Sequence, residues 1–311
     1  MFKGEIISLV VAVSWTITAL FAEKATGRLG TLTANLLRLV LASLFLALLL
    51  WVTVGAPYPV YADGPAWLWL SLSALVGYVF GDWCLFNSYR VIGARFGQLF
   101  MTLAPPMAAV AGWVILGESL SWKSALAMLV TLSGIAISIL SRGDKGRQVQ
   151  LTLPLKGVLL GIGAGFGQGV GLVLSKVGMQ HYLEALPADA PAHMGTMLPF
   201  ASTMIRALVG SAGFFVLIAL QRSMGQLKTG LHDAKGLKYV VVLTLFGPVL
   251  GVSLSLMAVQ FTSAGIASTL MALTPVLILF PYAFIYKQKI KGREILGVAL
   301  SMLGVALFFL L

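Results

Sequence analysis

The most constraining feature of this 311-residue chain is an internal repeat. When the sequence is compared with itself, its third to fifth apolar segments align with its eighth to tenth. In this alignment, the matched residues of the first half are Gly77, Gly81, Ala94, Met101, Leu103, Pro105, Ile115, Gly134 and Ala136. They align, in the same order, with Gly247, Gly251, Ala264, Met271, Leu273, Pro275, Ile285, Gly304 and Ala306. Earlier segments match in other registers, with 34–38 facing 202–206 and Lys3-Gly4 facing Lys156-Gly157. The chain is therefore a duplicated unit of five apolar segments.

The composition places these segments in a membrane. With 59% hydrophobic and 10% charged residues, the chain has too few polar side chains for a soluble surface. We predict an all-α membrane protein with ten transmembrane helices, arranged as two inverted five-helix repeats. The predicted spans are 4–22, 31–54, 66–89, 96–117, 122–141, 157–180, 198–221, 236–258, 265–286 and 293–311. The two repeats are 1–141 and 156–311, joined by a basic linker at 142–155.

The net charge of +11 is explained by the loops and does not require a nucleic-acid partner. Sixteen Lys and Arg residues fall in the loops after the odd-numbered spans, including the linker, whereas only Lys3 and Lys123 lie on the other side. Positive residues concentrate on the cytoplasmic side of a membrane. We therefore expect a multi-pass protein of the cell inner membrane, with a cytoplasmic linker and both termini in the periplasm.

Charge also tests the inversion of the second repeat. The loop after the first span is basic, whereas its counterpart at 181–195 contains no Lys or Arg. The loop after the second span contains neither residue, whereas its counterpart after the seventh span has four. Opposite bias at equivalent loops is the pattern that two oppositely oriented copies require.

No motif in the sequence indicates a cofactor. Cys84 is the sole cysteine, and His181, His193 and His232 fall in predicted loops without the spacing of a metal site. The glycine-rich stretch 161–171 contains no G-x-G-x-x-G and has no predicted strand before it. We therefore expect no cofactor and no metal, and coupling to a proton gradient stays an open possibility.

The same glycines form two rows on a helix, Gly161/Gly165/Gly169 and Gly163/Gly167/Gly171. Small residues allow neighbouring backbones to approach closely, so tight packing on both sides is the first interpretation. The alternative is that one row leaves room for a ligand beside Gln168. Both stay open at this stage.

Prolines recur at equivalent positions, with Pro105 in the fourth span and Pro275 in the ninth. Each removes a helical hydrogen bond and bends the helix in the membrane. Free backbone groups at that depth line a cavity or meet a partner. We expect matching cavity walls in the two halves, with a simple packing kink as the alternative.

Asp82 is the acidic residue that lies well inside a predicted span. A carboxylate in the membrane faces a cavity or a counter-charge. One hypothesis is that Asp82 binds a substrate amine or exchanges protons. The other is a structural ion pair with Arg95 or Arg38, or a neutral protonated acid. Its repeat counterpart is Val252, so symmetry does not require a charge there.

Two arginines also fall within spans. Arg38 and Arg206 match between the repeats, so we expect them near opposite membrane faces. They either extend towards the interface and pair with helix ends, or act as gate charges. Further candidates for a polar and aromatic lining are Tyr78, Trp15, Gln98, Thr102, Ser268 and Thr269.

At the level of motifs, the chain resembles the EamA-like branch of the drug/metabolite transporter superfamily. The resemblance rests on ten short spans in two repeats, on residues 93–105 around Pro105, on Leu116-Gly117-Glu118-Ser119-Leu120 and on the Gly81-Asp82 pair. It implies a central cavity lined by spans 3, 4, 8 and 9, with spans 1, 2, 6 and 7 moving around it. It also implies export of small metabolites such as amino acids. In the second half Gln288 stands where the family-like acid would be.

We therefore predict a secondary transporter, an exporter of small metabolites that works by alternating access. Its partners would be a small-molecule substrate and the lipid bilayer, as a monomer or weak homodimer. No Walker sequence is present, so direct coupling to ATP is not expected. The alternative is an intramembrane enzyme or a lipid-carrier flippase, although neither HExxH nor G-x-S-x-G occurs.

Overall fold

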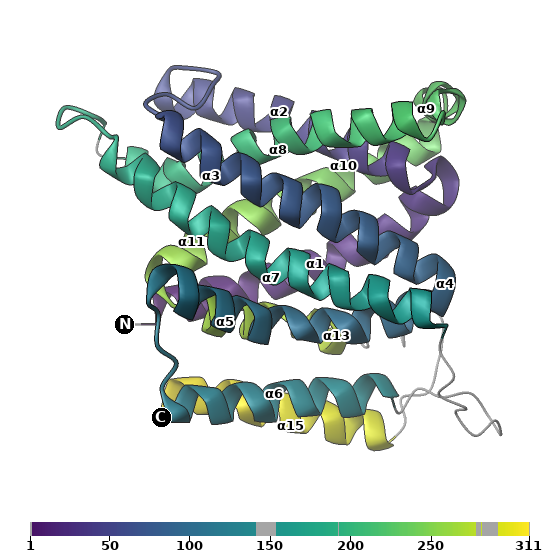
Figure 1. Cartoon of the computed structure of the whole chain (residues 1–311), viewed down its shortest axis with the longest axis vertical. Coiled ribbons are helices and arrows are strands. Elements are labelled where there is room, and N and C mark those ends of the chain that lie inside the picture. Colours follow the sequence, from purple (N-terminus) through teal and green to yellow (C-terminus); the bar gives the residue numbers. More distant parts are fainter. Residues whose placement is uncertain (1, 141–153, 192, 278–280, 282–291, 311) are drawn as a thin grey trace.

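All regular secondary structure in the described part of the computed structural model is helical, and that part comprises residues 2–140, 154–191, 193–277, 281 and 292–310. Within these ranges the side chains of 23, 89–90, 93–99, 138–140, 275, 294 and 308–309 are not described. The helices form one bundle with both termini at the same end (Figure 1).

The helices follow the apolar pattern of the sequence. The first half contains α1 (Lys3–Leu29), α2 (Thr31–Val54), α3 (Gly64–Ala74), α4 (Trp83–Phe100), α5 (Ala104–Leu116) and α6 (Trp122–Leu140). The second half contains α7 (Leu155–Glu184), α8 (Met194–Leu220), α9 (Met224–Leu231), α10 (Ala234–Thr244), α11 (Ser253–Phe261), α12 (Ala264–Met271), α13 (Thr274–Leu277) and α15 (Gly292–Leu310).

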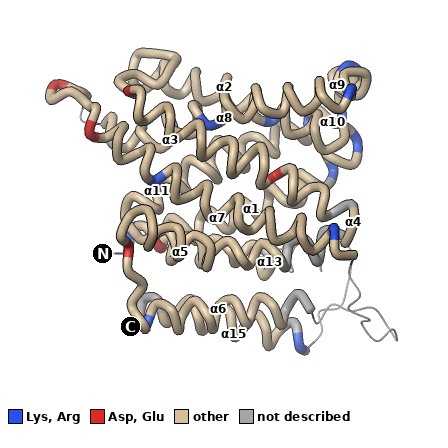
Figure 2. Tube along the Cα trace, in the orientation of Figure 1, with Lys and Arg blue, Asp and Glu red and all other residues tan. Residues whose placement is uncertain are grey.

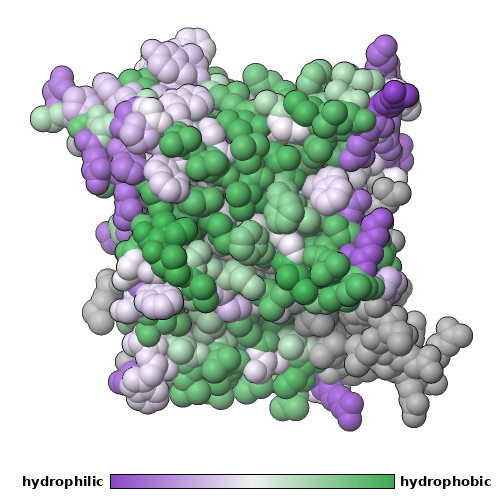
Figure 3. Space-filling view, in the orientation of Figure 1, coloured by the Kyte–Doolittle hydropathy of each residue, from purple (hydrophilic) through white to green (hydrophobic). Residues whose placement is uncertain are grey.

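The described helices make this a multi-pass membrane protein. Six helical stretches are long and apolar enough to cross a bilayer, and three shorter apolar helices accompany them. Apolar side chains cover the middle of the visible face, between hydrophilic edges at its two ends (Figure 3). The count of ten spans stays a prediction, because part of the expected ninth span lies outside the described residues.

Two π-helical segments occupy equivalent positions in the repeats. The segment η1 (Leu75–Asp82) joins α3 to α4, and η3 (Leu245–Val252) joins α10 to α11. Gly77 and Gly81 in η1 match Gly247 and Gly251 in η3 in the sequence comparison. Segments of π-helix are rare and are frequently found at functional sites. The sequence pattern predicted ordinary α-helix at both places.

The helix boundaries differ from the prediction around the third and fourth spans. We expected a loop at 90–95, but α4 is helical from Trp83 to Phe100. No proline interrupts the backbone hydrogen bonds before Pro105, so the helix continues. The change of helical geometry comes at the 3-10 turn Met101–Leu103 (η2), and Pro105 then lies in the first turn of α5.

A matching interruption occurs in the second half. There α12 ends at Met271 and α13 begins at Thr274, so Pro275 again lies in the first turn of the next segment. A proline in the first turn costs no helical hydrogen bond, because that N–H has no partner within the helix. The prolines therefore begin new helical segments instead of bending continuous ones.

The glycine rows of α7 pack against backbone on two sides. A Cβ atom on Gly167 would lie 2.7 Å from Cα of Gly81, and one on Gly171 would lie 2.8 Å from Cα of Gly77. On the other row, a Cβ atom on Gly169 would lie 2.5 Å from the carbonyl oxygen of Ala104. The close-packing interpretation is therefore confirmed for both rows, and α7 holds η1 and α5 on either side.

The pair α6 and α15 lies beside the remaining helices (Figure 1). Gly134 of α6 faces Ser301 of α15, and the equivalent Gly304 faces Thr131. Charge is unevenly distributed along the bundle: Lys and Arg gather at the end formed by α9 and the start of α10, whereas most acidic residues lie at the opposite end (Figure 2). We call these the basic end and the terminal end.

Candidate functional site

A cavity of about 410 Å³ lies between the two halves of the bundle. Its lining comes from both repeats and includes both π-helical segments. We call it the central cavity. Its lining residues are Trp15, Thr18, Ala19, Ala22, Thr26, Arg38, Tyr78, Asp82, Leu85, Phe86, Met101, Thr102, Ala104, Pro105, Gln168, Leu172, Arg206, Gly247, Val252, Ser255, Ser268, Met271, Ala272 and Thr274. The lining set thus extends beyond the four spans that the family resemblance implied, to α1, α2, α7 and α8.

Asp82 has two hydrogen-bonding partners in this cavity. Arg38 of α2 donates from Nη2 to Oδ2 of Asp82, forming an ion pair. Gln168 of α7 donates from Nε2 to Oδ1 of Asp82 at 2.8 Å and to the carbonyl oxygen of Gly77 at 3.2 Å. The Asp82 side chain is 8% exposed and that of Arg38 is 11% exposed. Both carboxylate oxygens therefore accept hydrogen bonds. This geometry matches the hypothesis of a structural ion pair, with Arg38 as the partner.

Arg206 also lies over the ring of Tyr78. Its guanidinium carbon is 4.6 Å from the centroid of the Tyr78 ring, and that of Arg38 is 5.9 Å from the same centroid. A cation over an aromatic face is attracted by the ring quadrupole. The prediction that Arg38 and Arg206 lie near opposite membrane faces is wrong, because α2 and α8 pack together and bring both cations to one ring.

Polar atoms remain unpartnered around Arg206. Arg206 is 5% exposed and Tyr78 is 4% exposed. Within the described part of the chain, Nε of Arg206, Nε of Arg38 and the hydroxyl of Tyr78 have no hydrogen-bond partner. Arg38 is nevertheless paired with Asp82 through Nη2, so Arg206 and Tyr78 are the residues that require an explanation.

The other predicted site residues divide into three groups. Trp15, Thr102, Pro105 and Ser268 line the central cavity as expected. Thr269 does not line it: the residue is fully buried and its hydroxyl donates to the carbonyl of Gly265, because one residue further along α12 points into the protein. The side chains of Arg95, Gln98 and Pro275 lie outside the described residues, as does Gln288.

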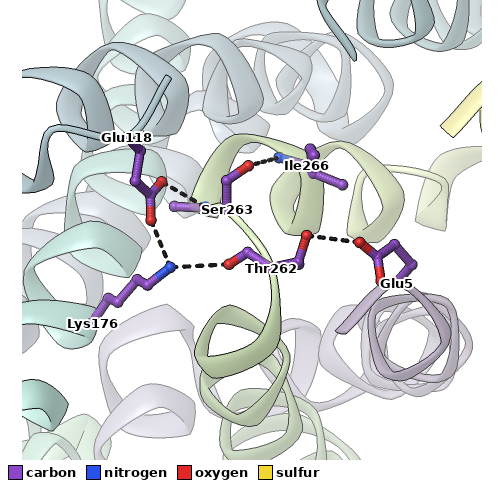
Figure 4. A network of polar contacts seen from close by, with 7 residues as sticks. Glu5, Glu118, Lys176, Thr262, Ser263 and Ile266 are labelled. Carbon is purple, nitrogen blue, oxygen red and sulfur yellow. Dashed lines mark hydrogen bonds and ion pairs between the residues drawn. The ribbon is translucent and has the colours of Figure 1, made fainter. Parts of the chain in front are cut away.

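A second polar cluster occupies the terminal end of the bundle (Figure 4). Lys176 of α7 donates from Nζ to Oε1 of Glu118 at 2.5 Å and to the carbonyl oxygen of Thr262 at 3.0 Å. Oε2 of Glu118 accepts from the backbone N–H of Ala264, the first residue of α12, at 3.0 Å. The hydroxyl of Thr262 donates to Oε1 of Glu5 at 2.8 Å. We call these residues the Lys176 network.

This network joins α1, α7, the end of α5 and the α11–α12 connection. The Lys176 and Glu118 side chains are 15% and 16% exposed, so the ion pair is largely enclosed. The sequence reasoning missed Lys176 altogether. The signal was present, because Lys176 is a cation within the apolar span 157–180, like Arg38 and Arg206 in theirs.

An ion pair also lies at the basic end. Nε and Nη2 of Arg28 donate to the two carboxylate oxygens of Asp233 at 2.7 and 2.9 Å. Asp233 also accepts from the backbone N–H of Gly236 and so caps α10. The hydrogen bond from Arg28 lowers the pKa of Asp233 below its ordinary value of 3.8, with the Gly236 N–H as the next contribution.

The sequence matches a known family over nearly its whole length. The EamA-like transporter family matches residues 2–140 and 155–310. The chain belongs to the EamA-like transporter family. This membership fits the drug/metabolite transporter superfamily and makes the protein a membrane transporter.

Two relatives accompany this EamA-like match. A protein from Clostridium kluyveri named as an uncharacterized transporter is 30% identical over 119 residues, which are 38% of this chain and 37% of that protein. The chain thus matches little more than a third of that relative's length. A protein solved by crystallography has the same fold, with a TM-score of 0.71 and 17% identity, over 99% of this chain and 96% of that one.

Proposed function

We propose that this EamA-like protein is a secondary transporter that exports small polar or amphipathic metabolites, such as amino acids or related compounds, from the cytoplasm by alternating access. The observation that carries the proposal is a charged central cavity between the two repeats, with a largely enclosed ion-pair network at the terminal end; the ion pair described at the basic end, Arg28–Asp233, is more exposed. The family membership supports transport over an intramembrane enzyme or a lipid-carrier flippase.

The position of the central cavity along the bundle supports access from the basic end. Lining residues follow α1 turn by turn from Trp15 to Thr26, so the cavity extends towards the basic end. At the terminal end, the Lys176 network ties α1, α5, α7 and the α11–α12 connection together. We propose that breaking this network opens the cavity towards the terminal end, while closure occurs at the basic end.

Coupling to a proton gradient is part of the proposal. Asp82 is a buried carboxylate in the cavity, and its ion pair with Arg38 depends on its charge. Protonation of Asp82 would remove that charge and weaken the tie between α2 and η1. Such a change gives a proton a means of biasing two conformations.

Reconstituted protein tests transport directly. Proteoliposomes loaded with a mixture of amino acids and related metabolites should release one or more of them over time, as measured by mass spectrometry of the external medium. Release should depend on an imposed pH gradient, and protein-free liposomes provide the control. Chemical conversion of a compound without flux, or movement of a labelled lipid carrier between leaflets, would overturn the proposal in favour of the enzyme or the flippase.

A further inference from the structure

We propose that the central cavity recognises an anionic group of the substrate, a carboxylate or a phosphate, through Arg206 and Tyr78. This inference rests on the proposed transport function and specifies its substrate class. It starts from the repeat, which places Arg38 and Arg206 at equivalent positions. One of these arginines has a carboxylate partner in the described structure, and the other has none.

The missing partner follows from the sequence of the second repeat. Asp82, the partner of Arg38, ends η1, whereas its counterpart Val252 ends η3. Val252 lines the same cavity but carries no charge. The second repeat therefore supplies an arginine without supplying the acid that balances it in the first.

The amide partner is missing too. The register that pairs Lys3 with Lys156 also pairs Trp15 with Gln168. The structure supports this equivalence, because Gln168 approaches Gly81 and Trp15 approaches the matching Gly251. Arg38, Asp82 and Gln168 thus form a hydrogen-bonded set, although Nε of Arg38 has no partner. At the equivalent positions of the second repeat, the side chains of Val252 and Trp15 offer Arg206 no hydrogen-bond acceptor.

Arg206 cannot easily gain a protein partner. A Cβ atom on Gly77 would lie 3.2 Å from Nη2 of Arg206, so any larger residue there would press on the guanidinium. Tyr78 covers one face of the same group. The cavity holds two arginines and one aspartate among its lining residues, which leaves it with a net positive charge. Asp82 is the acid among these lining residues, and it also interacts with Arg206, but its oxygens accept hydrogen bonds from Arg38 and Gln168. One carboxylate balances only one of the two arginines, so an anion entering the cavity would be stabilised there.

The chemistry of the available donors selects the class of anion. A guanidinium presents its donors in a fork that matches carboxylate and phosphate oxygens. The Tyr78 hydroxyl is a further donor without a partner in the described structure; it is enclosed, so a substrate would reach it only after the neighbouring side chains shift. The rest of the wall includes Trp15, Met101 and Met271, which suit an apolar body. The expected substrate is a small amphipathic anion or zwitterion.

An amine at Asp82 is the competing assignment, and it is one of the two hypotheses that the sequence leaves open. Both carboxylate oxygens of Asp82 already accept hydrogen bonds, from Arg38 and Gln168. An amine would have to displace one of these donors. Arg206 requires no such exchange, so the anion site is the one that the structure leaves available.

Matched probes with one carbon skeleton test this assignment. Purified protein in an uncharged detergent is titrated with 4-methylpentanoate, 3-methylbutyl phosphate, 3-methylbutylamine and leucine, and binding is followed by thermal stabilisation at constant ionic strength. The carboxylate or the phosphate should stabilise the protein, leucine should bind through its carboxylate, and the amine should not bind. Comparison of the first two probes distinguishes a carboxylate site from a phosphate site.

Variants locate the binding charge. Arg206→Gln should weaken binding of the anionic probe by about ten- to a hundredfold, the loss expected for charge-assisted hydrogen bonds. Arg206→Lys keeps the charge if the glutamine variant fails to fold, and should retain part of the affinity. Tyr78→Phe removes only the hydroxyl and should weaken binding to a smaller extent. Arg222→Gln, an exposed site outside the cavity, is the matched control.

Stabilisation by the amine alone, by all probes equally or by none would overturn the anion site. So would full retention of anion affinity in both Arg206 variants. These outcomes are independent of the proteoliposome assay. Flux without a preference for anions would support the transporter proposal and contradict the anion site. Anion binding without flux would support the anion site and contradict the transporter proposal.

Discussion

Asp82 and Val252 end the two π-helical segments at equivalent positions, and both line the central cavity. The two halves of the chain thus present the same backbone geometry with different charge. Because an acid occupies this position in the first repeat and a valine in the second, Arg38 has an ion-pair partner, whereas Arg206 forms no ion pair with the described residues. This single difference makes the cavity electrostatically asymmetric.

The first prediction concerns the buried ion pair. Asp82→Asn leaves Arg38 without a counter-charge and should lower the free energy of unfolding by about 3–5 kcal/mol, the usual cost of removing one partner of a buried pair. The double variant with Arg38→Gln should recover part of this stability. Unfolding in a denaturing detergent titration measures both. Normal stability of Asp82→Asn would show that the ion pair does not stabilise the fold, whatever the effect on flux.

The Lys176 network should control access from the terminal end. In a Cys84→Ser background, a Ser268→Cys reporter places one thiol in the central cavity. Lys176→Met removes the donor to Glu118 and Thr262, so an impermeant maleimide added at the terminal end should label the reporter faster than before. Lys3→Met, an exposed lysine at the same end, is the control. Unchanged labelling in Lys176→Met would show that the network does not close this route.

The prolines should affect transport more than folding. Pro105→Ala restores one backbone N–H beside Pro106, which relaxes the interruption at Met101–Leu103 and alters the cavity wall. Initial flux should fall for Pro105→Ala and for Pro275→Ala, while the free energy of unfolding changes by about 1 kcal/mol or less. Pro57→Ala, in an exposed loop, is the control. If both variants transport normally, the prolines serve packing only.

The Arg28–Asp233 pair predicts a pH dependence at the basic end. The pKa of Asp233 is lowered in the folded protein, so its contribution to stability is fully present above the ordinary value of 3.8 and is lost as the pH falls through the folded value. Asp233→Asn keeps an oxygen that can cap α10 but removes the charge. Lowering the pH below about 4 should therefore reduce the unfolding temperature of the wild-type protein more than that of this variant. The exposed Asp189→Asn should behave like wild type.

Orientation can be tested with a reporter. The excess of Lys and Arg in the odd loops predicts that the terminal end faces the periplasm. A protein that fluoresces only in the cytoplasm, fused after Leu311, should stay dark, and the same protein inserted in the linker at 142–155 should be bright. The opposite pattern would reverse the assignment and, with it, the direction in which the cavity opens.

Sequence reasoning reached the repeat and much of the site. Apolar length and self-similarity gave the helical class, and the match of Gly77 and Gly81 to Gly247 and Gly251 anticipated two equivalent segments, although not their π-helical geometry. Asp82, Tyr78 and Gln168, which the sequence offers as candidates, line the central cavity; their role in binding or coupling stays a prediction.

The sequence by itself determined the membrane class, the duplication and the charge asymmetry of the loops. These properties depend on composition and on the spacing of residues along the chain, and neither depends on how the helices pack. Only the tertiary structure decided that Arg38 binds Asp82, that Arg206 lies over Tyr78 and that Lys176 binds Glu118. Such pairings depend on the rotation and crossing of helices, and a shift of one residue turns a side chain by about 100° around the helix axis. A change of that size separates Ser268 in the cavity from Thr269 in the protein interior.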